Sequence, residues 1–337
     1  MKINNRRYIG CKTKLLDFIY TTAVEFGAVP NTTFADIFAG TGAVGSFFAN
    51  KGYQVILNDT LYSNILAYQA WHGNGEINEE KITRIINELN DIDGDTVKNN
   101  YFSNVYGDKY FSVSDAKKIG YMRDYIEEIK NDLTEREYAY LITSLIYTTD
   151  RIANTCGHFE SFLSKKPEEK GVMLSELEID EDCLPAAIYN MDANELVRNI
   201  SCDIAYLDPP YNARQYVNFY HVLENLARWN KPTDFEGNSM KFKRQELKSD
   251  YCRNKAPQLM EDLVMNLDCK LIIVSYNNTY KAKSISSINT ISAEQIVEIL
   301  SKRGKVSIKE QKYRAFNSGK TNLKGHKELL YICEVGK

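Results

Sequence analysis

An acid, two prolines and an aromatic ring directly follow an apolar stretch near the middle of the chain. Residues 204–207 form a predicted strand, and Asp208, Pro209, Pro210 and Tyr211 come next. Proline fixes its own φ and lacks an N–H, so the chain leaves the strand rigidly with carbonyl oxygens that no neighbouring donor uses. A carboxylate, a free carbonyl and a flat ring suit an aromatic amine, such as the amino group of adenine. For this segment taken alone, the alternative is a purely structural role, in which the aspartate caps a turn at the proline-rich end of the strand.

A glycine-rich turn lies upstream, between a predicted buried strand at 33–38 and the start of a helix. Its glycines let the backbone approach a ligand closely, and the helix start offers free N–H groups. The next strand, 54–59, ends in Asp59, near the spacing at which a carboxylate binds ribose hydroxyls. The glycine-rich turn and Asp59, taken alone, fit the binding of either a dinucleotide or S-adenosylmethionine. No hydride-transfer constellation is evident and Asp208 to Tyr211 is present, which favours S-adenosylmethionine.

Several segments, in this order, resemble the DNA adenine-N6 methyltransferases. The resemblance is strongest to the group in which the cofactor motif comes first, which includes the Dam methylases and the modification enzymes of type IIS restriction systems. Residues 8–16 resemble the N-terminal Gly-Gly-Lys-x-x-Leu motif, with Cys11 in place of the second glycine. Residues 38–42 resemble the Phe-x-Gly-x-Gly cofactor motif, and 208–216 resemble the catalytic loop, in the extended form of the type IIS enzymes.

The resemblance implies a mechanism and a set of site residues. Asp208 and a proline carbonyl would accept hydrogen bonds from the adenine amino group, whose nitrogen would attack the sulfonium methyl group directly, with no metal. Because N6 is paired inside a duplex, the base would be flipped out and stacked on Tyr211. The implied catalytic residues are Asp208, Pro209, Pro210 and Tyr211. The implied cofactor-binding residues are Tyr8, Gly10, Lys12, Lys14, Phe38, Ala39, Gly40, Thr41, Gly42, Asp59, Asp192, Ala193 and Asp208, with Asp59 at the ribose and Asp192 at the adenine of the cofactor. A plain core role is the alternative for Phe38.

The fold implied is α/β, with a Rossmann-like methyltransferase sheet that ends in an antiparallel hairpin. Residues 306–316 and 328–334 would form that hairpin. Residues 1–72 and 188–337 would make up the catalytic domain.

An inserted, mainly helical segment, 73–187, lies where this methylase group carries its target-recognition domain. Apolar residues at helical spacing predict helices near 79–91, 115–130 and 134–152. A second, basic insertion at 231–257 is predicted to contact DNA.

The net charge of −3 hides a strongly uneven distribution. The windows 1–20, 241–255 and 301–327 together carry a net charge of +16, which leaves −19 for the remainder. A basic face opposed by an acidic one suits contact with phosphates, although lysine-rich loops can also be merely solvated. The predicted DNA-binding residues are Asn154, His158, Asn212, Arg214, Gln215, Tyr216, Lys241, Lys243, Arg244 and Lys248. A structural role is the alternative for His158, and no general base is needed there.

Composition fits an intracellular enzyme. The 337 residues are 43% hydrophobic, and the seven cysteines include no Cys-x-x-Cys pair, which predicts reduced thiols in a cytoplasmic protein. The resemblance to DNA methylases implies a bacterial protein that acts at the nucleoid. No apolar run is long enough to span a membrane. We expect a monomer acting on double-stranded DNA, with a possible cognate restriction endonuclease. The alternatives are an RNA or protein methyltransferase of the same fold, or an inactive DNA-binding specificity subunit. Asp rather than Asn at position 208 disfavours the enzymes that methylate amides.

Overall fold

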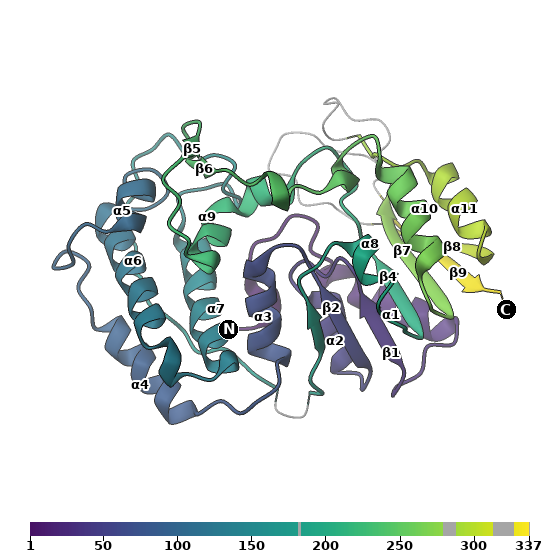
Figure 1. Ribbon diagram of the computed structural model, residues 1–337, viewed down its shortest axis with the longest axis horizontal. Coiled ribbons are helices and arrows are strands. Elements are labelled where there is room, and N and C mark those ends of the chain that lie inside the picture. Colours follow the sequence, from purple (N-terminus) through teal and green to yellow (C-terminus); the bar gives the residue numbers. More distant parts are fainter. Residues whose placement is uncertain (181–182, 279–287, 313–326, 337) are drawn as a thin grey trace. The chain divides into compact units, whose positions relative to one another are not determined.

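The computed structural model describes residues 1–180, 183–278, 288–312 and 327–336. The chain divides into two compact units (Figure 1). The helical unit comprises Met1–Ile9, Leu61–Glu181 and Val217–Glu246. The sheet unit comprises Gly10–Thr60, Asp182–Tyr216 and Leu247–Lys337.

A mixed sheet of seven strands forms the centre of the sheet unit within the described residues, in the order β3-β2-β1-β4-β7-β9-β8. The first five strands in this order are parallel, and β9 is antiparallel to both β7 and β8. The strands are β1 (Thr33–Asp36), β2 (Gln54–Asn58), β3 (Ala187–Tyr189), β4 (Ile204–Leu207), β7 (Leu271–Asn277), β8 (Gly304–Lys312) and β9 (Lys327–Val335). β4 and β7 are buried along their whole lengths, which explains their near-continuous apolar sequences.

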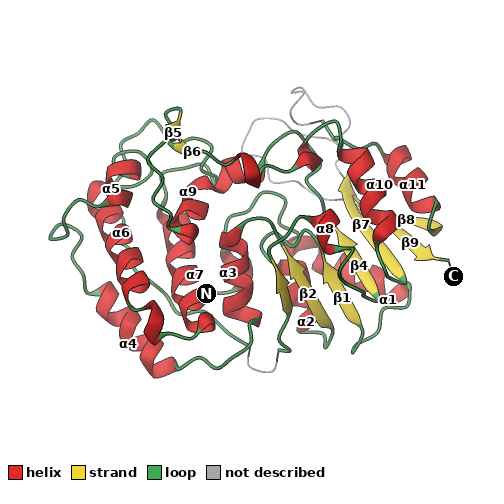
Figure 2. Cartoon of the chain, viewed as in Figure 1, coloured by secondary structure: helices red, strands yellow, loops and turns green. Residues whose placement is uncertain are grey.

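Helices cover both faces of this sheet (Figure 2). On one face, α8 (Ala193–Leu196), α10 (Ala256–Asn266) and α11 (Ala293–Ser301) share one apolar core with the strands. On the other face lie α1 (Leu16–Glu25) and α2 (Ala43–Ala49), where Phe34 of β1 stacks on Phe48 of α2 with ring centroids 3.7 Å apart. Successive strand residues point to opposite faces, so the two cores separate cleanly.

The helical unit consists mainly of α3 (Tyr62–His72), α4 (Glu79–Asn90), α5 (Tyr101–Tyr106), α6 (Val113–Glu128), α7 (Glu135–Ile152) and most of α9 (Tyr216–Arg228). A short hairpin, β5 (Phe235–Glu236) and β6 (Lys241–Phe242), belongs to the same unit. Side chains of Asn78, Ser112 and Thr134 cap α4, α6 and α7. Glu224 of α9 is buried and accepts hydrogen bonds from the first backbone N–H groups of α3, at Tyr62 and Ser63.

The sequence-based elements agree closely with those observed. The three helices predicted within 73–187 correspond to α4, α6 and α7, and the strands predicted at 33–38, 54–59 and 204–207 correspond to β1, β2 and β4. The antiparallel pairing of the last two strands is also as predicted, whereas residues 313–316 of the predicted hairpin lie outside the described residues. The short β3 and α8 and the helix α10 were not predicted. α10 starts within the predicted loop 231–257, because Pro257 suits the first turn of a helix.

The two compact units divide the chain at other residues than the predicted domains, whose boundaries stay a prediction. The helical unit takes in the first nine residues, since the Arg7 backbone N–H donates to Asp150 of α7 at 3.0 Å. It also takes in most of α9 and the hairpin that follows it. Whether 73–187 is a recognition domain stays a prediction. In the described part of the chain, no helix is long and apolar enough to cross a membrane.

Candidate active site

Three segments that are distant in sequence meet at the carboxyl ends of β1 and β4 in the sheet unit. Gly10 has φ +82°, and a Cβ placed on it would lie 3.0 Å from the hydroxyl oxygen of Tyr216. Cys11 Sγ lies 3.6 Å from Thr41 Oγ1 in the glycine-rich turn. The N-terminal motif thus contacts both the turn after β1 and the loop after β4, and only glycine fits at position 10 without strain.

Asp208 is the charged centre of this region. The Nζ atom of Lys12 lies 3.1 Å from Asp208 Oδ1, so the two side chains form an ion pair. Burial raises the pKa of Asp208 to about 6, and the positive charge of Lys12 opposes that rise. A carboxyl group of this kind is poised to change its protonation near neutral pH, which is common at functional sites.

The turn after β1 has the backbone geometry of a ligand cradle. Gly40 and Gly42 have φ of +56° and +76°, values that glycine adopts easily. The Gly40 N–H donates to Asp59 Oδ2 at 3.0 Å, so the acid that follows β2 is held against this turn. Asp36 at the end of β1 accepts a hydrogen bond from Gly45 N–H, and burial, followed by the charge of Asp208, raises the Asp36 pKa well above its usual range.

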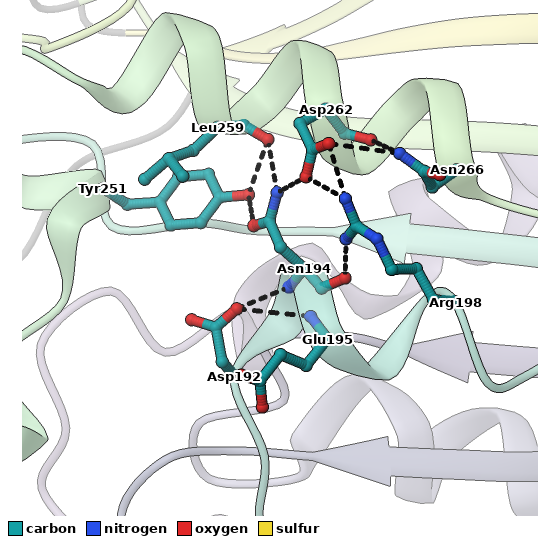
Figure 3. Close-up of polar contacts among 8 residues, drawn as sticks. All are labelled: Asp192, Asn194, Glu195, Arg198, Tyr251, Leu259, Asp262 and Asn266. Atoms are coloured by element: carbon teal, nitrogen blue, oxygen red, sulfur yellow. Dashed lines mark hydrogen bonds and ion pairs between the residues drawn. The ribbon is translucent and has the colours of Figure 1, made fainter.

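Asp192 lies at the start of α8, just after β3 (Figure 3). Its Oδ1 atom caps the helix by accepting from the N–H groups of Asn194, at 2.9 Å, and Glu195, at 3.3 Å. The same α8 is tied to α10, because Asn194 Nδ2 donates to Asp262 at 2.7 Å, while the hydroxyl of Tyr251 donates to Asn194 Oδ1. This network holds in place the segment on which Asp192 and Ala193 stand.

Phe38 packs edge to face on Tyr251, with ring centroids 5.0 Å apart, and contacts the apolar core of that face of the sheet. Both the cofactor role and the core role predicted for Phe38 are compatible with this position. Lys14 is exposed, and Tyr8 lies in the helical unit, stacked on Tyr220 at 4.6 Å.

The backbone of the catalytic loop is held by residues from outside it. The carbonyl oxygen of Tyr211 accepts hydrogen bonds from the Thr290 N–H at 2.9 Å and from the Tyr276 hydroxyl at 3.4 Å. The Tyr211 ring meets the ring of Tyr276 at an angle of 74°, and Lys12 Nζ is 5.7 Å from its centroid. These contacts fix the position of the ring that follows the two prolines.

Residues 212–215, which follow Tyr211, are also held by hydrogen bonds. The amide side chain of Gln215 makes two hydrogen bonds to the backbone of Ser249, at 2.9 and 2.8 Å. The Cys252 thiol donates to the Arg214 carbonyl oxygen, and Asn212 Oδ1 accepts from the Arg214 N–H. Residues 249–252 therefore support the loop directly.

The predicted DNA-binding side chains are in varied surroundings. Arg214 and Lys243 are exposed, and Lys241 is half-buried. Asn154 Nδ2 donates to three backbone carbonyls, and buried Arg244 donates to Asn218, Glu236 and the Phe242 carbonyl. Asn154, Arg244 and Gln215 thus donate hydrogen bonds within the protein, which disfavours a direct contact of these three side chains with DNA. His158 Nδ1 accepts from the Glu160 N–H at 3.4 Å.

Several residues that support the site could not be found from its motifs. Glu328 of β9 lies 3.0 Å from Lys12 Nζ, and Ser275 of β7 donates to Glu328 at 2.9 Å. A charged residue at the start of an otherwise apolar strand was the only local sign of Glu328. Among the described residues, no group of three or more His, Cys, Asp or Glu side chains is arranged to hold a metal ion.

A family model for D12 class N6 adenine-specific DNA methyltransferases matches residues 8–313. The modification methylase StsI of Streptococcus sanguinis is 35% identical to this chain over 344 residues, which cover 97% of the chain and 51% of that protein. The type II methyltransferase M.NlaIII of Neisseria lactamica is 32% identical over 341 residues, which cover 97% of the chain and 98% of that protein. The type II methyltransferase M.FokI of Planomicrobium okeanokoites is 32% identical over 315 residues, which cover 88% of the chain and 47% of that protein.

The chain belongs to the D12 class N6 adenine-specific DNA methyltransferase family. It spans about half the length of the StsI and FokI methylases and nearly the whole length of the NlaIII methyltransferase. The resemblance found from the motifs is therefore confirmed, and the seven-stranded mixed sheet with its helices fits the α/β methyltransferase fold expected from it.

Proposed function

We propose that this chain transfers a methyl group from S-adenosylmethionine to N6 of adenine in double-stranded DNA, as the modification component of a restriction-modification system. The observation that carries the proposal is Asp208, a largely buried carboxylate at the carboxyl end of β4, followed by two prolines and a braced aromatic ring. Ligands of open α/β sheets bind at this end of the strands. Membership of an adenine-specific family supports the same reaction.

The residues around the glycine-rich turn fit S-adenosylmethionine. The positive φ values of Gly40 and Gly42 keep side chains out of the turn, and Asp59, which accepts the Gly40 N–H beside this turn, is proposed to accept the ribose hydroxyls. Asp192 uses one carboxylate oxygen to cap α8, which leaves the second to accept from the adenine amino group of the cofactor. When bound, this cofactor supplies an electrophilic methyl group on its sulfonium.

The chain's own residues then prepare the target nitrogen. The amino lone pair of adenine is delocalised into the ring, so the nitrogen is a poor nucleophile. Hydrogen bonds from the amino group to Asp208 and to the Pro209 or Pro210 carbonyl favour a pyramidal nitrogen with a localised lone pair. Because these acceptors are fixed before the substrate arrives, little reorganisation is needed during the reaction. The proton lost from nitrogen passes to Asp208 or to water.

Access to N6 requires that the base leave the duplex, and Tyr211 is the proposed stacking partner. The Tyr211 backbone is held by Thr290 and Tyr276, so the ring offers a surface that is ordered in advance. The segment 73–187 is proposed to read the recognition sequence, and Arg214 and Lys243 to contact phosphates. The monomeric state and a cognate endonuclease remain parts of the proposal.

Transfer of labelled methyl groups tests the proposal. The purified chain is incubated with tritiated S-adenosylmethionine and unmethylated DNA, and the DNA is digested to nucleosides. We expect N6-methyl-2′-deoxyadenosine, absent with Asp208→Asn and retained with Asp268→Asn, a matched change at an exposed aspartate at the opposite end of the sheet. Label in another nucleoside contradicts the adenine assignment. Label only in RNA or protein supports the alternative substrates, and cofactor binding without transfer supports an inactive specificity subunit.

A further inference from the structure

A buried carboxylate on the last strand of the sheet shares Lys12 with Asp208. Lys12 Nζ is 3.1 Å from Asp208 Oδ1 and 3.0 Å from Glu328 Oε1. The side chains of Lys12 and Glu328 are only 5% and 3% exposed, so water screens this pair of contacts very little. Ser275 adds a hydrogen bond to the same Glu328 oxygen at 2.9 Å.

The three charged groups come from distant parts of the chain. Lys12 precedes the short 3₁₀ helix Thr13–Leu15, Asp208 ends β4, and Glu328 lies on β9 opposite Asn277 of β7. A buried lysine loses hydration, and an excess of favourable partners must offset that loss. Burial lowers the pKa of Lys12, but Asp208 and then Glu328 raise it, and the net result is well above the usual value. Lys12 therefore stays a cation.

Two carboxylates and one ammonium leave this cluster one negative charge in excess. Asp36 adds a further buried carboxyl group, and Tyr206 and Tyr211 are the other titratable groups around Asp208 and Lys12. Glu328 therefore acts on Asp208 in two ways. It holds the ammonium of Lys12 at a fixed place beside Asp208, and its own charge opposes ionisation of Asp208.

We propose that Glu328 is a positioning residue for methyl transfer, which fixes Lys12 against Asp208 and thereby sets the charge and the orientation of the carboxylate that receives the adenine amino group. This inference rests on the proposed role of Asp208. Oδ1 of Asp208 is paired with Lys12, so Oδ2 is the oxygen that accepts the hydrogen bond from the adenine amino group in this proposal.

The charges make opposite predictions for two variants. In Glu328→Gln the amide keeps the shape and can still accept from Ser275, but the negative charge is gone, so Asp208 ionises more easily. In Lys12→Met the stabilising cation is gone, so Asp208 ionises less easily. A charge at this range shifts a carboxyl pKa by roughly 1 unit or more.

The test is the titration of Asp208 itself, followed by carboxyl ¹³C NMR in the full chain and assigned with Asp208→Asn. We expect the midpoint to fall by about one pH unit in Glu328→Gln and to rise by about one pH unit in Lys12→Met. Glu334→Gln, an exposed glutamate on the same strand, is the control and should leave the midpoint unchanged. Equal midpoints in Glu328→Gln, Glu334→Gln and the wild type, or shifts of Glu328→Gln and Lys12→Met in the same direction, overturn the proposal.

The pH profile of methyl transfer gives the second readout. The acid limb of kcat/KM should move in the same directions as the titration, and kcat of Glu328→Gln above pH 8 should fall about tenfold because Lys12 is held less firmly. A Glu328→Gln enzyme with wild-type kcat and an unmoved acid limb contradicts the positioning role. If the wild type transfers no methyl group to DNA, the proposed function fails, while the titration still decides whether Glu328 and Lys12 set the charge of Asp208.

Discussion

β4 carries an aspartate at each end, and the two have opposite chemistry. Asp203, before the strand, accepts a hydrogen bond from the Thr33 N–H at 3.0 Å and pairs with exposed Lys270 at 2.6 Å. Asp208, after the strand, is largely buried and faces a lysine that it shares with Glu328. The hydrogen bond from Lys270 and then that from Thr33 lower the pKa of Asp203, whereas burial raises that of Asp208 to about 6.

The opposite pKa shifts of Asp203 and Asp208 indicate which end of β4 carries the carboxylate proposed for methyl transfer. The partners of Asp203 favour its charged form and thereby stabilise the folded chain at neutral pH. The surroundings of Asp208 disfavour its charged form, which costs stability. We therefore expect the two aspartates that flank β4 to have separable roles, Asp203 in stability and Asp208 in the proposed methyl transfer.

Replacement of Asp208 by its amide gives the largest expected effect. We expect Asp208→Asn to lower kcat by about 10³-fold or more, because an amide cannot supply the same acceptor charge at the reacting nitrogen. Its unfolding free energy should not decrease, since the variant no longer buries a carboxylate. Steady-state methyl transfer and urea unfolding measure the two effects. An active Asp208→Asn enzyme would remove Asp208 from the mechanism.

The pH dependence of activity distinguishes the role of Asp208 from that of Asp203 without a mutation. As the pH falls through about 6, Asp208 takes up a proton, and kcat/KM should then decrease about tenfold per pH unit. Circular dichroism should report an intact fold in the same range. A profile of kcat/KM that stays level down to pH 5 contradicts an ionised Asp208 as the acceptor.

Loss of the hydrogen bonds that support the loop after Tyr211 should lower activity less than loss of Asp208. Gln215→Ala removes both hydrogen bonds to Ser249, so the loop after Tyr211 gains freedom. We expect kcat/KM to fall by about three- to tenfold with little change in the cofactor Kd, which calorimetry can measure. A large change in cofactor affinity with unchanged kcat would place Gln215 in a different role.

The smallest effect on activity is expected for replacement of Asp203, which precedes β4. Asp203→Ala should leave kcat within about twofold and lower the unfolding free energy at pH 7 by about 1 kcal/mol, mainly through the lost Thr33 hydrogen bond. Since the folded pKa of Asp203 is lowered, this contribution is present above the ordinary value of about 3.9 and is lost as the pH falls through the lower folded value. Urea unfolding at pH 7 and at pH 3 checks both the size and the sign.

The sequence predicted the parts of the site that are local. Asp208 to Tyr211 and the turn around Gly40 are contiguous, and each is recognisable from residue types that fix the backbone or expose acceptors. The helices of 73–187 were also predictable, because their apolar spacing and their caps at Asn78, Ser112 and Thr134 are local signals.

The supporting residues were not predictable, because their roles depend on tertiary contacts. Glu328 follows Lys12 by more than 300 residues, and nothing near either residue indicates the pair. Gln215 and Arg244 have the side chains of DNA-contacting residues, yet their donors are used by Ser249 and by Glu236, Asn218 and Phe242. β3 escaped prediction because its three residues are only partly buried at the edge of the sheet.

The most direct test is modification-sensitive long-read sequencing of DNA from a methylation-free host that expresses the chain, with Asp208→Ala as the control. We expect N6-methyladenine at one short motif with the wild-type chain and none with the variant. A folded wild-type chain that binds S-adenosylmethionine and leaves every adenine unmodified would contradict this expectation, as would an identical methylation pattern in the Asp208→Ala strain.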